Sequence, residues 1–210
     1  KGLLADKEIK AALPKVQSWS GLCAAACGSW HFVGLRMDGT VIGEGKKMCR
    51  LEETGMWESV TAIACGRYGT VGLCEGGTVF SCGFPKAVAD ELASWTDITA
   101  IACGKEHVVG LRRNGTVVAC GENGSGQCNV GEYINVGMIS ASGECTALVF
   151  NDGTVKALGK FADASIADEK GIAAAACANF GNILRLTEEG GIRGEFSGVN
   201  SDDFEKDFEW

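Results

Sequence analysis

The chain has 210 residues, of which 46% are hydrophobic, and its 27 acidic side chains outnumber 19 basic ones, so the net charge is −8. A chain of this length buries enough surface to fold without disulfides or metal ions. Net negative charge repels phosphate backbones and anionic lipids, which argues against nucleic-acid and membrane partners. No apolar run approaches the roughly 18 residues of a membrane helix. We therefore expect a globular domain.

Residues 1–18 form an N-terminal segment that differs in pattern from the rest of the chain. Within it, Asp6 to Val16 predicts a short helix that is interrupted at Pro14, because proline lacks the backbone N–H of the helical ladder. We expect this segment to help complete a ring formed by the repeats that follow.

A repeat of about 38 residues occupies residues 19–210. Five turn dipeptides recur in register, and each glycine is followed two residues later by a β-branched residue. Asn-Gly and Asp-Gly favour hairpin turns, because Asn and Gly tolerate positive φ. The dipeptides are Asp38-Gly39, Gly76-Gly77, Asn114-Gly115, Asp152-Gly153 and Glu189-Gly190. They divide the chain into repeats 19–56, 57–94, 95–132, 133–170 and 171–210.

One strand of each repeat is built from small side chains. Examples are Ala24 to Gly28, Ala64 to Gly66 and Ala102 to Gly104. In a radial array of sheets the innermost strands converge on an axis, where only small residues fit. A large aromatic residue precedes this strand in the first four repeats. The pattern predicts an all-β fold, a β-propeller of about five short four-stranded blades.

The third repeat carries the clearest family likeness. Trp95-Thr96-Asp97-Ile98, Ala102-Cys103-Gly104-Lys105-Glu106-His107 and Asn114-Gly115-Thr116-Val117 resemble the repeat of the regulator of chromosome condensation propellers. The family has a bacterial branch that includes inhibitors of β-lactamases, and the chain resembles that branch. Family members usually have seven blades. The resemblance thus leaves two possibilities, a closed five-bladed ring, which we favour, and an incomplete seven-bladed propeller.

Eleven cysteines are the most reactive side chains of the sequence. Cys27, Cys65 and Cys103 share one repeat position, and Cys82 and Cys120 share another. Thiols that follow the architecture in this way are predicted to be small buried hydrophobes. The spacing lacks the paired halves of a structural zinc site, so we expect no metal and no cofactor. Many unpaired thiols favour a reducing compartment, the cytoplasm.

Two cysteine–histidine pairs, Cys27 with His31 and Cys103 with His107, form the alternative hypothesis of an enzyme with an axial thiolate site. The pair occurs twice in register, which a catalytic dyad does not require. We expect each histidine to hydrogen-bond the backbone at the start of a strand, and we predict that the chain is not an enzyme.

The loops after the small-residue strands are the candidate binding surface. In a propeller, equivalent loops share one face, and aromatic residues on rigid turns are typical of interface hot spots. The sequence therefore predicts a module that binds another protein, as a monomer or weak oligomer, with inhibition of a β-lactamase-type enzyme as an alternative. The candidate residues are Trp30, Tyr68, Lys105, Glu106, Glu144 and Phe180.

Overall fold

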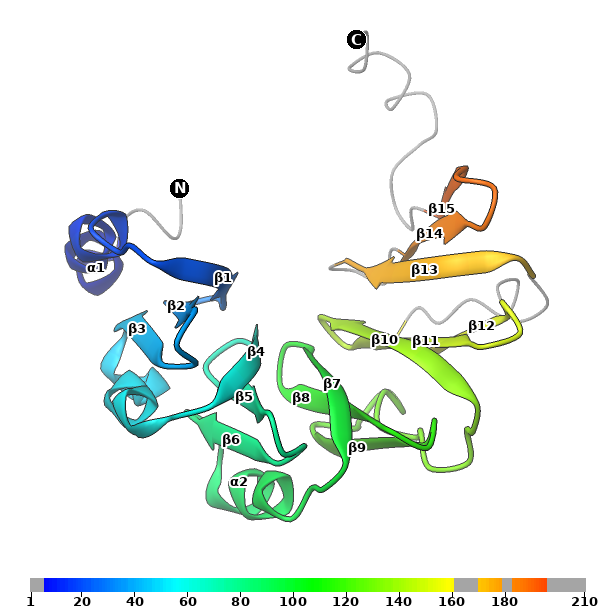
Figure 1. Cartoon of the computed structure of the whole chain (residues 1–210), viewed down its shortest axis with the longest axis horizontal. Helices are drawn as coiled ribbons and strands as arrows, with labels where there is room; N and C mark the ends of the chain where they lie inside the picture. The colour runs from blue at the N-terminus through cyan, green and yellow to red at the C-terminus, as the bar shows by residue number, and fades with distance from the viewer. Residues whose placement is uncertain (1–5, 161–169, 179–182, 196–210) are drawn as a thin grey trace, which may run out of the picture.

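A computed structural model describes residues 6–160, 170–178 and 183–195 (Figure 1). These residues form five antiparallel sheets of three strands each, in which the strands are ordered as they occur in the chain. The sheets are β1 (Leu22–Cys27), β2 (His31–Arg36) and β3 (Val41–Gly45); β4 (Val60–Cys65), β5 (Thr70–Cys74) and β6 (Val79–Cys82); β7 (Ile98–Cys103), β8 (His107–Arg112) and β9 (Val117–Gly121); β10 (Val136–Ser142), β11 (Cys145–Phe150) and β12 (Val155–Gly159); and β13 (Ile172–Cys177), β14 (Ile183–Thr187) and β15 (Ile192–Glu195).

The prediction of four-stranded blades is wrong for the described residues, where every sheet has three strands. After β3 the chain turns into two short 3-10 helices, η2 (Lys47–Cys49) and η3 (Leu51–Met56), and after β6 it forms helix α2 (Lys86–Ala93). The sequence of α2 combines Ala, Leu and Glu with a Lys86–Asp90 ion pair one turn apart, all of which favour a helix over an edge strand.

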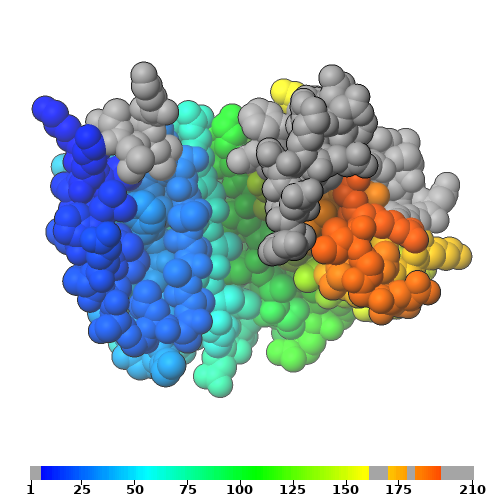
Figure 2. All heavy atoms as spheres, turned by 90° about the horizontal axis from the view of Figure 1, so that it is seen from above, coloured from blue at the N-terminus to red at the C-terminus, as the bar shows by residue number. Residues whose placement is uncertain are grey.

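The sheets fan around a common centre (Figure 1). β1, β4, β7, β10 and β13 face that centre, which confirms the prediction that the small-residue strands are innermost. Ring closure is not seen: Figures 1 and 2 show the first and fifth sheets apart, so the described residues form an open arc.

Residues 7–17 form helix α1 (Lys7–Gln17), which packs against β3 of the first sheet and adds no strand. The helix runs through Pro14 without the predicted interruption. Burial of Ile9 and Ala12 compensates for the missing hydrogen bond, and Asp6 caps the N-terminus by accepting from two backbone N–H groups. None of the described helices is long and apolar enough to cross a membrane.

Each predicted hairpin turn connects the middle and last strands of one sheet, and in the first four sheets it also forms a backbone hydrogen bond with the next sheet. Only the glycine of each turn has positive φ, between 78° and 84°, so the turn is a three-residue loop with glycine in the left-handed position. Its carbonyl oxygen accepts a 3.0 Å hydrogen bond from the first residue of the next inner strand. The four pairs are Gly39 with Val60, Gly77 with Ile98, Gly115 with Val136 and Gly153 with Ile172.

Apolar side chains fill the space between neighbouring sheets and form four separate clusters. The repeated tryptophans have a defined role in them. The rings of Trp57 and Trp95 lie over Gly72 and Gly110 of the middle strands, where a Cβ atom would come within 2.8 Å and 2.7 Å of the ring. In the fourth repeat the smaller Tyr133 replaces the tryptophan, and Leu148 replaces the glycine.

The fifth sheet repeats the apolar pattern but lacks a following sheet in the described part of the chain. Leu184, Leu186 and Ile192 are 44%, 42% and 69% exposed. The residues at their repeat positions in the first four sheets are between 0% and 7% exposed, because the next sheet covers them. Those residues are Val33, Val71, Val109 and Ala147; Leu35, Leu73, Leu111 and Val149; and Val41, Val79, Val117 and Val155.

Candidate functional site

The loops between inner and middle strands lie side by side at one end of the sheets. The backbone N–H of Arg67 donates to the carbonyl oxygen of Lys105 over 2.8 Å, and the N–H of Lys105 donates to Gly143 over 2.7 Å. Gly66 and Gly104 start two of these loops, and a Cβ at either position would lie within 3.0 Å of the neighbouring loop's carbonyl oxygen. The loops therefore form one closely packed and rigid face.

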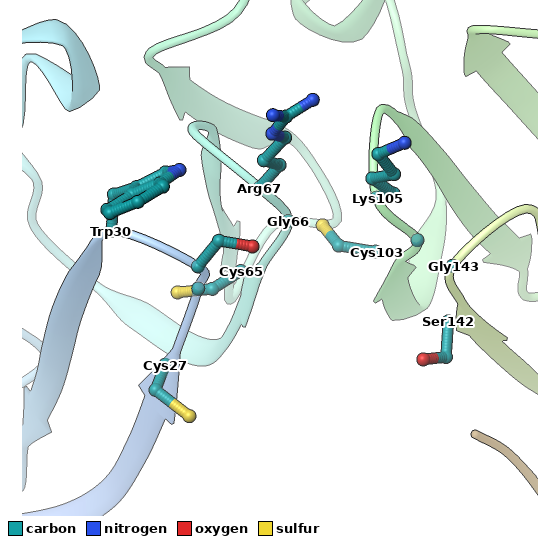
Figure 3. Close-up of a pocket in the computed structure, with 12 residues that line it drawn as sticks. Cys27, Trp30, Cys65, Gly66, Arg67, Cys103, Lys105, Ser142 and Gly143 are labelled. Carbon is teal, nitrogen blue, oxygen red and sulfur yellow. The ribbon is translucent and has the colours of Figure 1, made fainter. Parts of the chain in front are cut away.

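A cavity of about 600 Å³ opens between these loops near the centre of the arc (Figure 3). Cys27, Cys65 and Cys103 line it together with Ser142. Figure 3 shows Trp30, Arg67 and Lys105 along one side of the opening. Arg67 was not among the predicted residues, although it occupies the same repeat position as Lys105, and the repeat alignment was the signal that could have found it.

A smaller cleft of about 200 Å³ lies beside Tyr68, between the second and third sheets. Phe84, Pro85 and Val88 supply apolar walls, and Lys105 stands at its edge. Phe84 and Pro85 lie between β6 and α2, and Val88 lies within α2, so the strand pattern of the repeat did not identify them.

Five of the six predicted binding residues lie on this face. Trp30 is partly buried, and the Lys46 ammonium group lies 4.0 Å from its ring centroid. Tyr68 is also partly buried, and the Arg67 guanidinium group lies 4.9 Å from its ring centroid. Both rings pack against the cluster between the first two sheets, and both residues remain partly exposed.

The charged candidates are joined in ion pairs. Arg67 contacts Glu106 over 3.1 Å, and Lys105 contacts Glu144 over 3.7 Å. Each pair bridges two successive loops, so a chain of alternating charge crosses the face. Phe180, the sixth predicted residue, lies outside the described residues.

The cavity thiols differ in their surroundings. Contrary to the prediction that the in-register thiols are buried, Cys27 is exposed and Cys65 and Cys103 are only partly buried. Cys27 is the most open of the three because no preceding sheet covers β1 in the described part of the chain. Burial raises the pKa of Cys65 to about 12 and raises the pKa of Cys103 well above its ordinary value. Within the described ranges, no group of three or more Cys, His, Asp or Glu side chains is placed to hold a metal ion.

These pKa shifts predict the order of thiol alkylation in the folded protein at neutral pH. Exposed Cys23 and Cys27 should react with iodoacetamide, while Cys65 and Cys103 should react roughly 100-fold or more slowly, because only the thiolate is nucleophilic. Mass spectrometry of a labelling time course measures each rate. Rapid labelling of Cys65 or Cys103 would contradict this and revive the thiolate-enzyme hypothesis.

The two histidines connect sheets rather than activate thiols. His31 Nε2 lies 2.9 Å from Thr70 Oγ1 of the next sheet, and His107 Nε2 lies 2.9 Å from Thr146 Oγ1. Both rings are 1% exposed. The prediction of a backbone partner is therefore wrong: the partner is a threonine hydroxyl, which the sequence places one repeat further along the chain.

The tautomer of His107 follows from its partner. Thr146 Oγ1 donates to the carbonyl oxygen of Gln127 over 2.9 Å, so the Nε2–H of His107 must donate to Thr146 Oγ1. Burial lowers the pKa of both His31 and His107 to about 4. Both imidazoles are thus neutral at pH 7.

Comparison with known proteins agrees with this architecture. Residues 60–85 and 98–127, within the second and third repeats, match the regulator of chromosome condensation (RCC1) repeat. Among solved structures, human WBSCR16 is 21% identical with a TM-score of 0.65, and the match covers 82% of this chain and 61% of that chain. The ectodomain of the Physcomitrella patens receptor kinase CR4 is 15% identical with a TM-score of 0.65, covering 86% of this chain and 54% of that chain.

A structure of Kap60 bound to yeast RCC1 (Prp20) also matches, at 14% identity and a TM-score of 0.62, covering 88% of this chain and 58% of that chain. No curated protein matches the sequence significantly. The chain thus carries RCC1-like repeats in an RCC1-like propeller fold, and it spans 54–61% of the length of these three chains. The relation to β-lactamase inhibitors and a bacterial origin stay predictions.

Proposed function

We propose that the chain is a non-enzymatic module that binds another protein through the loop face described above. The observation that carries this proposal is the placement of five predicted residues and Arg67 on four successive loops that hydrogen bonds and ion pairs hold in place. A rigid face loses little conformational entropy on binding, so its partly exposed aromatic rings and charges contribute more of their interaction energy.

The shape of the face also fits a protein partner. The central cavity and the apolar cleft beside Tyr68 are separated by Lys105, which lines both. A partner that inserts one side chain into the cleft and covers the cavity would bury apolar surface in the cleft and would lie over the Arg67–Glu106 and Lys105–Glu144 pairs, which it could meet with charges of its own. The yeast RCC1 structure shows a related propeller in complex with a protein, Kap60.

The eleven cysteines, none of which forms a disulfide, support a reducing, cytoplasmic location for this interaction.

Charge reversal tests the face without removing a packed ring. Arg67→Glu and Lys105→Glu place like charges beside Glu106 and Glu144, and we expect each to reduce capture of the partner at least tenfold. Quantitative mass spectrometry of proteins captured from the source lysate measures the loss. Tyr68→Ala removes the aromatic ring and should have an effect of similar size.

Arg113→Glu is the matched control. Arg113 is exposed and is the first residue of the hairpin turn of the third sheet, at the opposite end from the loops. This variant should capture the partner as the wild type does. Equal capture by all four variants would remove the loop face from consideration. Inhibition of a β-lactamase by the wild type, measured with a chromogenic β-lactam, would instead support the inhibitor alternative.

A further inference from the structure

Two cysteine sulfurs meet at the junction between the fourth and fifth sheets. Cys145 begins β11, Cys177 ends β13, and their Sγ atoms lie 3.7 Å apart. Cys145 is 1% exposed, and Cys177 is partly buried against the cluster between the same two sheets. The backbone N–H of Cys177 donates to Ser140 Oγ over 2.9 Å, which holds the second thiol against the fourth sheet.

The position of this pair in the repeat is informative. Cys145 occupies the place of His31 and His107, the residues whose rings bond the next sheet at the first and third junctions. At the fourth junction the contact between sheets is therefore made by two thiols. Several other cysteine sulfurs lie near oxygen atoms, such as Cys65 near Thr70 Oγ1 and Cys49 near the carbonyl oxygen of Trp30.

We propose that Cys145 and Cys177 form an oxidisable dithiol that a hydroperoxide converts to a disulfide between the fourth and fifth sheets. In the first step the Cys145 thiolate attacks one peroxide oxygen, the O–O bond breaks, and hydroxide leaves and takes up a proton, which gives a sulfenic acid. In the second step the Cys177 sulfur attacks the Cys145 sulfur and displaces hydroxide, which leaves as water. Two thiols and one hydrogen peroxide thus yield one disulfide and two waters.

The pKa shifts of the two thiols indicate which cysteine reacts with the peroxide and which one resolves the sulfenic acid. The hydrogen bond between the thiols lowers the pKa of Cys145 and raises the pKa of Cys177, so the thiolate forms on Cys145. Cys177 resolves the sulfenic acid because its sulfur is already in contact. The small size of hydrogen peroxide suits a thiol that is nearly buried.

The disulfide would act on the least covered part of the fold. The forward face of the fifth sheet carries exposed Leu184, Leu186 and Ile192, so this sheet is packed on one side only in the described part of the chain. A covalent link to the fourth sheet restricts its separation from the arc. Oxidation is therefore expected to slow proteolysis within β13 to β15 about tenfold or more.

The test compares folded and urea-unfolded protein, each treated with hydrogen peroxide and then alkylated. Digestion at Lys, Arg and Glu separates Cys145 from Cys120 and Cys128, because Glu132 and Glu144 lie between them. Mass spectrometry should find Cys145 linked to Cys177 in the folded sample and no preference for that pair in the unfolded sample. The same treatment should produce the protection from protease.

Variants distinguish the chemistry from general oxidation. Cys177→Ser should leave a sulfenic acid on Cys145 that dimedone traps, whereas Cys120→Ser, which removes another buried thiol, should leave the link intact. The proposal is overturned if peroxide treatment of the folded protein leaves Cys145 and Cys177 as free thiols, which are alkylated once the protein is denatured, while exposed Cys23 and Cys27 are oxidised. It is also overturned if the linked pair forms equally in urea.

Discussion

Acidification from about pH 7 to about pH 4.5 is expected to lower the free energy of unfolding by roughly 2–3 kcal/mol for each of His31 and His107. Both pKa values fall to about 4 in the folded protein because burial disfavours the imidazolium ion. The unfolded chain titrates near the ordinary value of 6.5. Between these two values the unfolded state binds protons that the folded state does not, so stability is full above pH 6.5 and declines as the pH falls toward 4.

The measurement is urea unfolding at several pH values in this window, for the wild type and for a His31→Gln/His107→Gln variant. Glutamine keeps a donor that can bond the threonine hydroxyl but does not titrate, so the variant should be less stable at pH 7 and nearly flat with pH. The pKa values of Asp6, Asp38 and Asp152 are lowered by hydrogen bonds, so these carboxylates affect stability only at lower pH. An unchanged slope in the variant would contradict the assignment to histidine.

The histidine–threonine contact between sheets recurs at every second junction. His31 and His107 belong to the first and third sheets, and their partners Thr70 and Thr146 belong to the second and fourth. The second sheet has Gly69 at the histidine position, where a Cβ would lie 2.3 Å from the ring of Phe84. A phenyl ring thus takes the space that an imidazole fills elsewhere. The sheets therefore alternate in how they contact their neighbours, although the hairpin spacing is nearly constant.

The sequence predicted the features that depend on local backbone and residue size. The turn glycines need positive φ, and the inner strands need small side chains, so repeats, hairpins and the common face of Tyr68, Lys105 and Glu144 could be found without coordinates. The turn glycines and the small side chains of the inner strands recur in every repeat. A pattern that would be weak in one repeat is therefore recognisable when it occurs five times.

Other features depend on contacts between repeats and could not be read in the same way. The repeat pattern predicted a fourth strand in each blade, but the segment Lys86–Ala93 has its own helical preference and packs on β6 and β9. The partner of His107 lies a full repeat away, and no spacing rule identifies it. Closure of the ring depends on how much each junction rotates, which composition does not reveal.

Replacing Leu35 with alanine is expected to cost about 2–4 kcal/mol, whereas replacing Leu186 should cost under about 1 kcal/mol. The two leucines occupy the same position in their repeats, opposite Val41 and Ile192 across the hairpin. Leu35 is 2% exposed because the second sheet covers it, and Leu186 is 42% exposed. The difference between the two losses in unfolding free energy therefore measures the effect of burial by the neighbouring sheet, because the substituted side chain is the same.

Urea unfolding followed by circular dichroism measures both variants, and hydrogen exchange in β14 shows whether Leu186→Ala acts only on the fifth sheet. Leu111→Ala serves as a second buried reference, since Leu111 is 6% exposed at the same repeat position. If Leu186→Ala proves as costly as these two, the forward face of the fifth sheet is covered in solution. The exposed side chains Leu184 and Ile192 would then belong to an interface, because water-exposed leucine contributes too little transfer free energy to explain such a loss.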